Sequence, residues 1–152
     1  MSARRIASAL PTLASIAILG LAACGGGAVE TGPPADVRLD HASRAGNDAL
    51  SLGMLPLALR QYREALNRAY ERDDAGAIAD CAYNLALVQM RSGQSKAALA
   101  TVRDARAELD RRRATVPAEL VLVQAAAAYR TGDSGGAQVA ASEAIAGTAG
   151  DP

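Results

Sequence analysis

Residues 81–105 read CAYNLALVQMRSGQSKAALATVRDA and contain the clearest signal for the fold. Apolar residues recur at intervals of three and four on both sides of Gly93, which is the pattern of one amphipathic helix ending and another beginning. Ser95 is in place to cap the second helix. Because the turn around Gly93 is short, the two helices are expected to pair antiparallel. The stretch therefore predicts a helical hairpin.

A similar pair of helices precedes this hairpin. Residues 37–52 and 57–70 carry the same apolar spacing on either side of Gly53. Pro56 suits the first turn of the second helix, because the N–H that proline lacks is not needed there. The sequence thus predicts a second hairpin around Gly53.

A third pair of helices follows from Pro117 onward. Thr115 is a candidate N-cap, and Gly132 breaks the pair before an alanine-rich helix over about residues 137–146. The three turn glycines are separated by 40 and 39 residues. Repeats of roughly 20 to 50 residues indicate stacked structural units.

The composition favours the same class of fold. Half of the 152 residues are hydrophobic, with no Phe or Trp and four Tyr, whereas alanine fills 37 positions. Alanine is the best helix former and a poor strand former, so its abundance favours closely packed helices over sandwiches and barrels. The formal net charge is zero, which provides no electrostatic attraction for nucleic acid. We therefore expect an all-α protein without a nucleic-acid partner.

Small residues fill three repeat columns, counted from the turn glycines. The positions seven before, five after and twelve after each glycine hold only Gly or Ala: Gly46, Ala86, Ala125, Ala58, Ala98, Ala137, Ala65, Ala105 and Ala144. This pattern resembles the tetratricopeptide repeat, whose paired helices cross so closely that only small residues fit at these columns. The strongest match consists of Tyr83, Asn84, Leu85 and Ala86 with Gly93, Ala98 and Ala105.

The resemblance covers about residues 39–149 and implies a right-handed superhelical array of about three helical hairpins. The period is longer than in that family, and Ala42, Ala82 and Val121 stand in the early column where an aromatic residue is usual. No polar helix caps the third unit, which predicts that this unit frays or packs on another surface. We expect the repeat domain to span residues 37–150.

The N-terminal residues have the pattern of an export signal. Arg4 and Arg5 precede a mainly apolar run to residue 23, which is too short and too interrupted for a typical membrane-spanning helix. Its end, Leu21, Ala22, Ala23 and Cys24, resembles the lipobox of bacterial lipoproteins. The resemblance implies that residues 1–23 are a signal peptide and that Cys24 is acylated; the alternative is an uncleaved N-terminal anchor.

Residues 24–36 are then the lipidated cysteine and a flexible Gly- and Pro-rich tether. Gly rather than Asp after Cys24 favours the outer membrane in lipoproteins of this kind. With Cys24 acylated, Cys81 has no disulfide partner, and its apolar neighbours predict a core thiol rather than a reactive one. The expected location is the bacterial cell envelope, membrane-anchored and facing the periplasm.

The sequence carries little that points to catalysis. His41 is the only histidine. Because adjacent residues of a helix do not face each other, Asp40 cannot act as the carboxylate partner of a catalytic His41. The glycines at 25–27 lack the strand and lysine of a phosphate-binding loop, and the arginines at 111–113 suit the C-terminal end of a helix. We predict no catalytic residue, no metal site and no cofactor.

The predicted site is therefore a surface. In the tetratricopeptide family the first helix of each unit lines a concave groove, and the same columns here include the acidic residues Asp40, Asp80 and Glu119. Leu87, Met90 and Leu122 have the alternative interpretation of packing between helices. Tyr, Met and Arg are enriched at binding surfaces, so we assign the partner-binding groove to Tyr83, Asn84, Met90, Arg91, Tyr129 and Arg130.

These features favour a lipid-anchored scaffold or assembly adaptor, which binds a protein or peptide for an envelope complex such as a pilus, a secretin, or outer-membrane or cell-wall machinery. Two alternatives stay open. One is a structural lipoprotein that self-associates through its uncapped C-terminal repeat, around Val139, Ala140 and Ile145. The other is a small-ligand binder or enzyme that uses the groove.

Overall fold

The computed structural model describes residues 35–148, which form six α-helices and, in that range, no β-strand. The helices are α1 (Val37–Ser51), α2 (Leu55–Glu71), α3 (Ala75–Arg91), α4 (Ser95–Arg111), α5 (Ala118–Arg130) and α6 (Ser134–Thr148). The predicted signal peptide, Cys24 and all but the last two positions of the tether lie outside the described residues. None of the described helices is long and apolar enough to cross a membrane.

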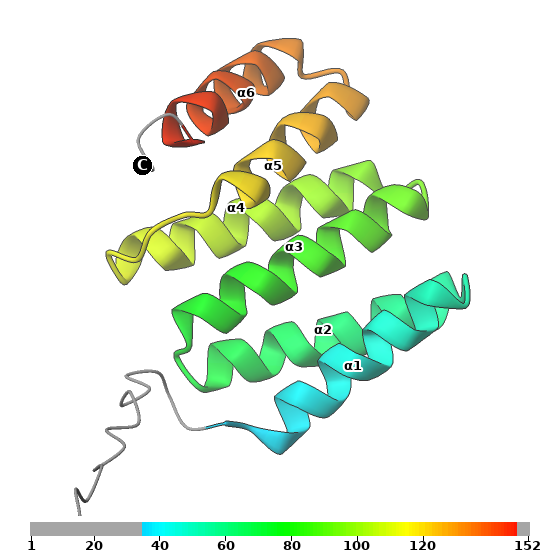
Figure 1. Ribbon diagram of the computed structural model, residues 1–152. Helices are drawn as coiled ribbons and strands as arrows, with labels where there is room; N and C mark the ends of the chain where they lie inside the picture. The colour runs from blue at the N-terminus through cyan, green and yellow to red at the C-terminus, as the bar shows by residue number, and fades with distance from the viewer. Residues whose placement is uncertain (1–34, 149–152) are drawn as a thin grey trace, which may run out of the picture. The chain divides into compact units, whose positions relative to one another are not determined.

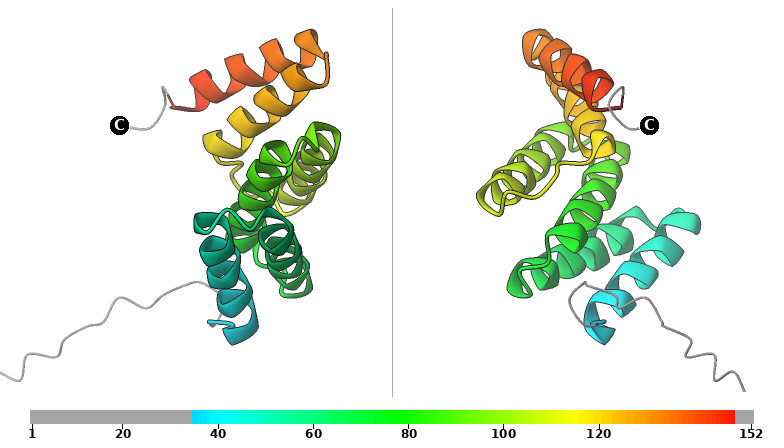
Figure 2. Two further views of the ribbon diagram at one scale, coloured as in Figure 1. Left: turned by 90° about the vertical axis from the view of Figure 1, so that its right-hand side faces the viewer. Right: turned by 60° about the vertical axis from the view of Figure 1, so that its left-hand side comes forward.

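The helices form three antiparallel hairpins, α1–α2, α3–α4 and α5–α6, which are stacked in chain order (Figure 1). Each helix packs on its neighbours in the chain, and α3 also packs on α5. Two further views show that successive hairpins are rotated relative to one another along the stack (Figure 2). The predicted all-α class and the predicted array of helical hairpins are confirmed.

The five connections between the described helices share one backbone geometry. Gly53, Gly93 and Gly132 have φ angles of 71°, 75° and 85°, and Asp73 and Arg113 have 58° and 55°. After each of them, the next N–H donates to the carbonyl five residues earlier, at 2.8 to 3.2 Å. The glycines predicted as turns therefore end α1, α3 and α5, and α2 and α4 end in the same way without glycine.

All nine small residues of the repeat columns are buried, because the paired helices approach closely at these positions. Gly46 shows how little room remains, since a Cβ atom there would lie 2.8 Å from two ring atoms of Tyr62. The Tyr62 hydroxyl in turn donates a hydrogen bond of 2.5 Å to Asn47 Oδ1. The small columns thus set the distance between the helices of each hairpin.

The core is substantial in the first two hairpins and thin in the third. Its largest completely buried side chains are Tyr62, Ile78, Val88, Val102, Leu109 and Leu120. Among the described side chains of α6, only three alanines are buried: Ala137, Ala140 and Ala144. The third hairpin therefore has less apolar surface to hold it together.

Two predicted helix caps are wrong. Ser95 is the first residue of α4 instead of its N-cap, because the tight turn at Gly93 leaves only Gln94 between the left-handed residue and the helix. Thr115 lies in the connection before α5, and Pro117 occupies the N-cap position there without a side-chain hydrogen bond. The last helix also begins at Ser134, three residues before the predicted start.

Asp36 fixes the start of the helical array against the end of α2. Its carboxylate accepts from the backbone N–H groups of Arg38 and Leu39 at 3.0 and 2.9 Å, which caps α1. It also accepts from Arg68 Nη2 at 2.7 Å and from Arg72 Nη1 at 3.0 Å. The hydrogen bond from Arg68 is the main reason why the pKa of Asp36 lies well below its usual range.

Candidate functional site

The first helices of the three hairpins, α1, α3 and α5, lie side by side on one side of the array (Figure 1). Each of them buries its apolar stripe against the core, which leaves its polar side chains toward solvent. We call the following exposed or half-exposed side chains the first-helix face: Asp40, Asp80, Tyr83, Asn84, Arg91, Glu119, Leu122, Tyr129 and Arg130.

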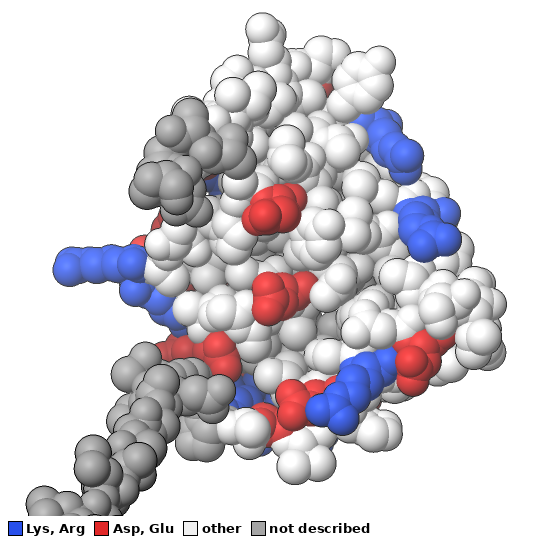
Figure 3. All heavy atoms as spheres, viewed as in Figure 1, with Lys and Arg blue, Asp and Glu red and all other residues white. Residues whose placement is uncertain are grey.

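Charge is ordered along the first-helix face. Asp40, Asp80 and Glu119 each stand thirteen positions before a turn glycine, and Arg91 and Arg130 stand two positions before one. Asp40 and Glu119 lie in the first turns of α1 and α5, and Arg91 and Arg130 lie in the last turns of α3 and α5, so these four charges also complement the helix dipoles. Figure 3 shows acidic groups isolated among uncharged atoms in the middle of this face, and basic groups along the edge where α3 and α5 end.

Four of the predicted site residues meet at that basic edge. Arg130 Nη1 donates a hydrogen bond of 3.1 Å to the backbone carbonyl of Met90, which joins the C-terminal ends of α5 and α3. Arg91 is exposed beside this contact, and 73% of Tyr129 is exposed. The edge therefore presents two guanidinium groups and a phenol ring.

Tyr83 and Asn84 belong to a separate part of the face, two turns earlier in α3. Both are half-buried, and Tyr83 packs against the core. Tyr83 lines a hollow of about 190 Å³ between α3 and α5, together with Ala79, Asp80, Pro117, Glu119 and Leu120. The predicted site omitted Asp80 and Glu119, although an acidic residue in the same column of all three repeats was a signal for them.

Leu87, Met90 and Leu122 had packing between helices as their alternative interpretation, and the structure supports it for the first two. Leu87 and Met90 are half-buried and lie against the core, so their side chains serve the fold first. Leu122 is 49% exposed, which leaves it available for a partner on the first-helix face. Leu122 and Tyr129 are therefore the two large apolar side chains that this face presents most openly.

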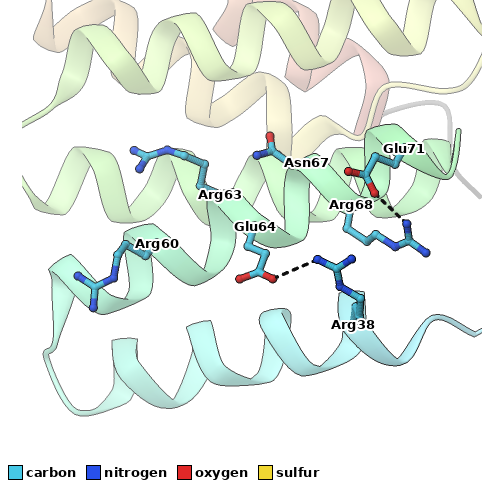
Figure 4. Close-up of a pocket in the computed structure, with 7 residues that line it drawn as sticks. All are labelled: Arg38, Arg60, Arg63, Glu64, Asn67, Arg68 and Glu71. Atoms are coloured by element: carbon cyan, nitrogen blue, oxygen red, sulfur yellow. Dashed lines mark hydrogen bonds and ion pairs between the residues drawn. The ribbon is translucent and has the colours of Figure 1, made fainter.

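A second hollow, of about 380 Å³, lies on the outer side of the first hairpin (Figure 4). Arg38 and Glu64 pair at 3.7 Å, and Arg68 and Glu71 pair at 2.8 Å. Arg60 and Arg63 also line it, but in Figure 4 their guanidinium groups do not point toward a common centre. Arg38 and Arg68 are thus neutralised by glutamates within the hollow, and Arg60 and Arg63 are not arranged to bind one anion together.

Among residues 35–148 there is neither a metal-binding group nor an exposed thiol. His41 is exposed on α1, and within residues 35–148 no group of three or more His, Cys, Asp or Glu could hold a metal ion. Cys81 is buried with its Sγ 4.0 Å from Ser43 Oγ, and burial raises the pKa of its thiol to about 11. The thiol therefore stays protonated at neutral pH.

The last helix offers a different surface from the one predicted. Val139 and Ile145 are 69% and 68% exposed on α6. Ala140, which was predicted to share that surface, is buried against Val121, Ala125 and Ala144, because it occupies the side of α6 that packs on α5. The exposed apolar part of α6 is thus confined to separate side chains.

The described residues define a class of protein, an all-α array of helical hairpins with an open first-helix face. Comparison with protein-family models and with curated proteins finds no match to this chain. The function is therefore inferred from the sequence pattern and from the first-helix face.

Proposed function

We propose that this protein is a lipid-anchored adaptor of the bacterial cell envelope, which binds a protein or peptide through the first-helix face. The observation that supports it most is the combination of Leu122 and Tyr129, exposed to 49% and 73%, with ordered charges on the same face. Aromatic and arginine side chains contribute much of the binding energy at protein interfaces. The resemblance to the tetratricopeptide repeat supports the same role.

The membrane part of the proposal depends on Cys24. Residues 21–24 resemble a lipobox, and each buried methylene of an acyl chain contributes about 0.8 kcal/mol to membrane binding, so a multiply acylated cysteine holds firmly. Replacement of Cys24 by Ala should abolish fatty-acid labelling and either release the protein from the membrane fraction or leave it as precursor. A parent protein that takes up no fatty-acid label would contradict the lipid anchor.

The binding part is tested with a photocrosslinking amino acid in the full chain, placed at Tyr129 in one variant and at Arg63 in another. Arg63 is exposed on α2, outside the first-helix face, so it serves as the matched control. The proposal expects that the variant at position 129 crosslinks to one foreign envelope protein, with a similar yield in replicate experiments. The variant at position 63 should not crosslink to that protein. Equal capture from both positions would contradict a specific site on this face.

Self-association is the second candidate, and the exposure of Val139 and Ile145 on the terminal helix favours it. The same crosslinking experiment separates the two functions when a third variant carries the photoreactive residue at Val139. A crosslinked product of twice the mass from position 139, with no foreign protein from position 129, would support the self-associating lipoprotein instead.

A further inference from the structure

The hollow between α3 and α5 combines apolar and acidic walls in a small space. Its volume is about 190 Å³, below the roughly 300 to 1,000 Å³ that small-molecule sites usually occupy. Ala79, Pro117 and Leu120 supply apolar surface, Tyr83 supplies an aromatic ring, and the remaining two lining residues are carboxylates. Such a space matches one long side chain better than a whole ligand.

The two carboxylates, Asp80 and Glu119, come from different helices and take part in no ion pair among residues 35–148. This differs from the acids that hold the array together, such as Asp36 and Glu143, which pair with arginines. Burial and, secondarily, the charge of Asp74 raise the pKa of Asp80. A cation bound beside Asp80 would favour the charged carboxylate and lower its pKa again.

The chemistry of the hollow selects among cations. No group of three or more metal-binding side chains exists in the described part of the chain, so the hollow lacks the set of six to eight oxygen ligands that Ca²⁺ takes. A basic side chain has both parts that the hollow can bind: an aliphatic stem for Leu120 and Pro117, and a charged head for the carboxylates. The ring of Tyr83 can add a cation–π contact.

We propose that this hollow, lined by Asp80, Tyr83 and Glu119, binds one Lys or Arg side chain of the protein segment that occupies the first-helix face. The inference rests on the proposed function and makes it more specific. It also fixes the direction of a partner, because Arg91 and Arg130 at the other end of the face favour an acidic group there.

The test uses the full chain in neutral-detergent micelles and a short blocked peptide, in which one arginine stands beside a photoreactive leucine. A second peptide carries citrulline, which has nearly the shape of arginine without its charge. We expect the arginine peptide to label residues 79–83 and 117–120 with roughly five to ten times the yield of the citrulline peptide. The double variant Asp80→Asn and Glu119→Gln should reduce labelling to the citrulline level.

Asp104→Asn is the matched control, because Asp104 is an exposed aspartate in the middle of α4, away from the hollow, and its loss should leave labelling unchanged. Circular dichroism of every variant verifies the fold. Equal labelling by the two peptides, or undiminished labelling of the folded double variant, would overturn the inference.

This outcome can be separated from failure of the proposed function. A foreign partner captured from position 129 without any charge-dependent labelling by the peptide would keep the adaptor role and remove the basic side chain from it. Charge-dependent labelling by the peptide without a foreign partner captured from position 129 would keep the basic-side-chain site and remove the adaptor role.

Discussion

At the residue scale, Arg113 occupies a backbone conformation that normally favours glycine. Its φ angle is 55°, and the equivalent positions after α1, α3 and α5 are glycines. The left-handed conformation costs a non-glycine residue about 1 kcal/mol. Glycine avoids this cost, but it also raises the conformational entropy of the unfolded chain, which offsets part of the gain in stability. Arg113→Gly should therefore raise the free energy of unfolding by up to about 1 kcal/mol in urea titrations.

The control for this prediction is Ala107→Gly, at an exposed position inside α4. A glycine in a helix interior should lower stability by about 1 kcal/mol. Two substitutions by glycine only six residues apart are thus expected to act in opposite directions. If both destabilise the protein equally, Arg113 is not strained in solution.

Asp36 makes stability depend on pH. Its folded-state pKa lies below the ordinary value of 3.8, so its contribution is fully present above about pH 4 and is lost as the pH falls further. Asp36→Asn keeps a helix cap but removes the charge that Arg68 and Arg72 bind. We expect a lower Tm at pH 7 and a smaller loss of Tm between pH 5 and pH 3 than in the parent. Asp48→Asn, at an exposed position of α1, should change neither quantity much.

At the scale of the helices, the small residues of the repeat columns allow the two helices of each hairpin to cross at close distance. Ala98 is completely buried where α4 meets α3, whereas Ala100 is exposed on the same helix. Ala98→Leu should lower the free energy of unfolding by about 1 to 3 kcal/mol, because the added atoms force the helices apart. Ala100→Leu adds the same atoms into solvent and should have little effect. Chemical unfolding of both variants provides the comparison, and equal losses would refute the predicted crossing.

The elements that the sequence predicts well are those with local signals. Gly53, Gly93 and Gly132 mark three turns, and the nine small residues mark the crossings. The turns at Asp73 and Arg113 share the same geometry without a glycine to reveal it. The site follows the same rule: repeat columns indicate which residues lie on the first-helix face, whereas the hollow beside Tyr83 arises from the packing of α5 on α3, which periodicity does not specify.

Across the whole molecule, stability should decrease toward the C-terminal hairpin. Among the described side chains of α6, only alanines are buried. Arg106 links α4 to this hairpin by hydrogen bonds of 2.8 Å to Gln124 in α5 and 2.5 Å to Glu143 in α6. Hydrogen exchange measured by mass spectrometry on the full chain should therefore be faster in α6 than in α3.

Removal of this link should affect the last hairpin more than the rest. Arg106→Ala should increase exchange in α6 further, whereas Lys96→Ala, at an exposed position in the first turn of α4, should not. Uniform exchange along all described helices would show that the thin core of the last hairpin does not limit its stability.

The molecule has two alternative surfaces for a partner, the first-helix face and the exposed side chains of α6. Arg91→Ala and Tyr129→Ala remove exposed groups and should each cost about 1 to 3 kcal/mol of binding free energy without loss of helicity. Tyr83 is a poorer probe, since it also packs against the core and its truncation would lower stability. Calorimetry with the partner captured from position 129 provides the measurement, and Arg63→Ala on α2 should be near neutral. Self-association through α6 makes the opposite forecast: Val139→Asp would abolish the complex while Arg91 and Tyr129 were dispensable.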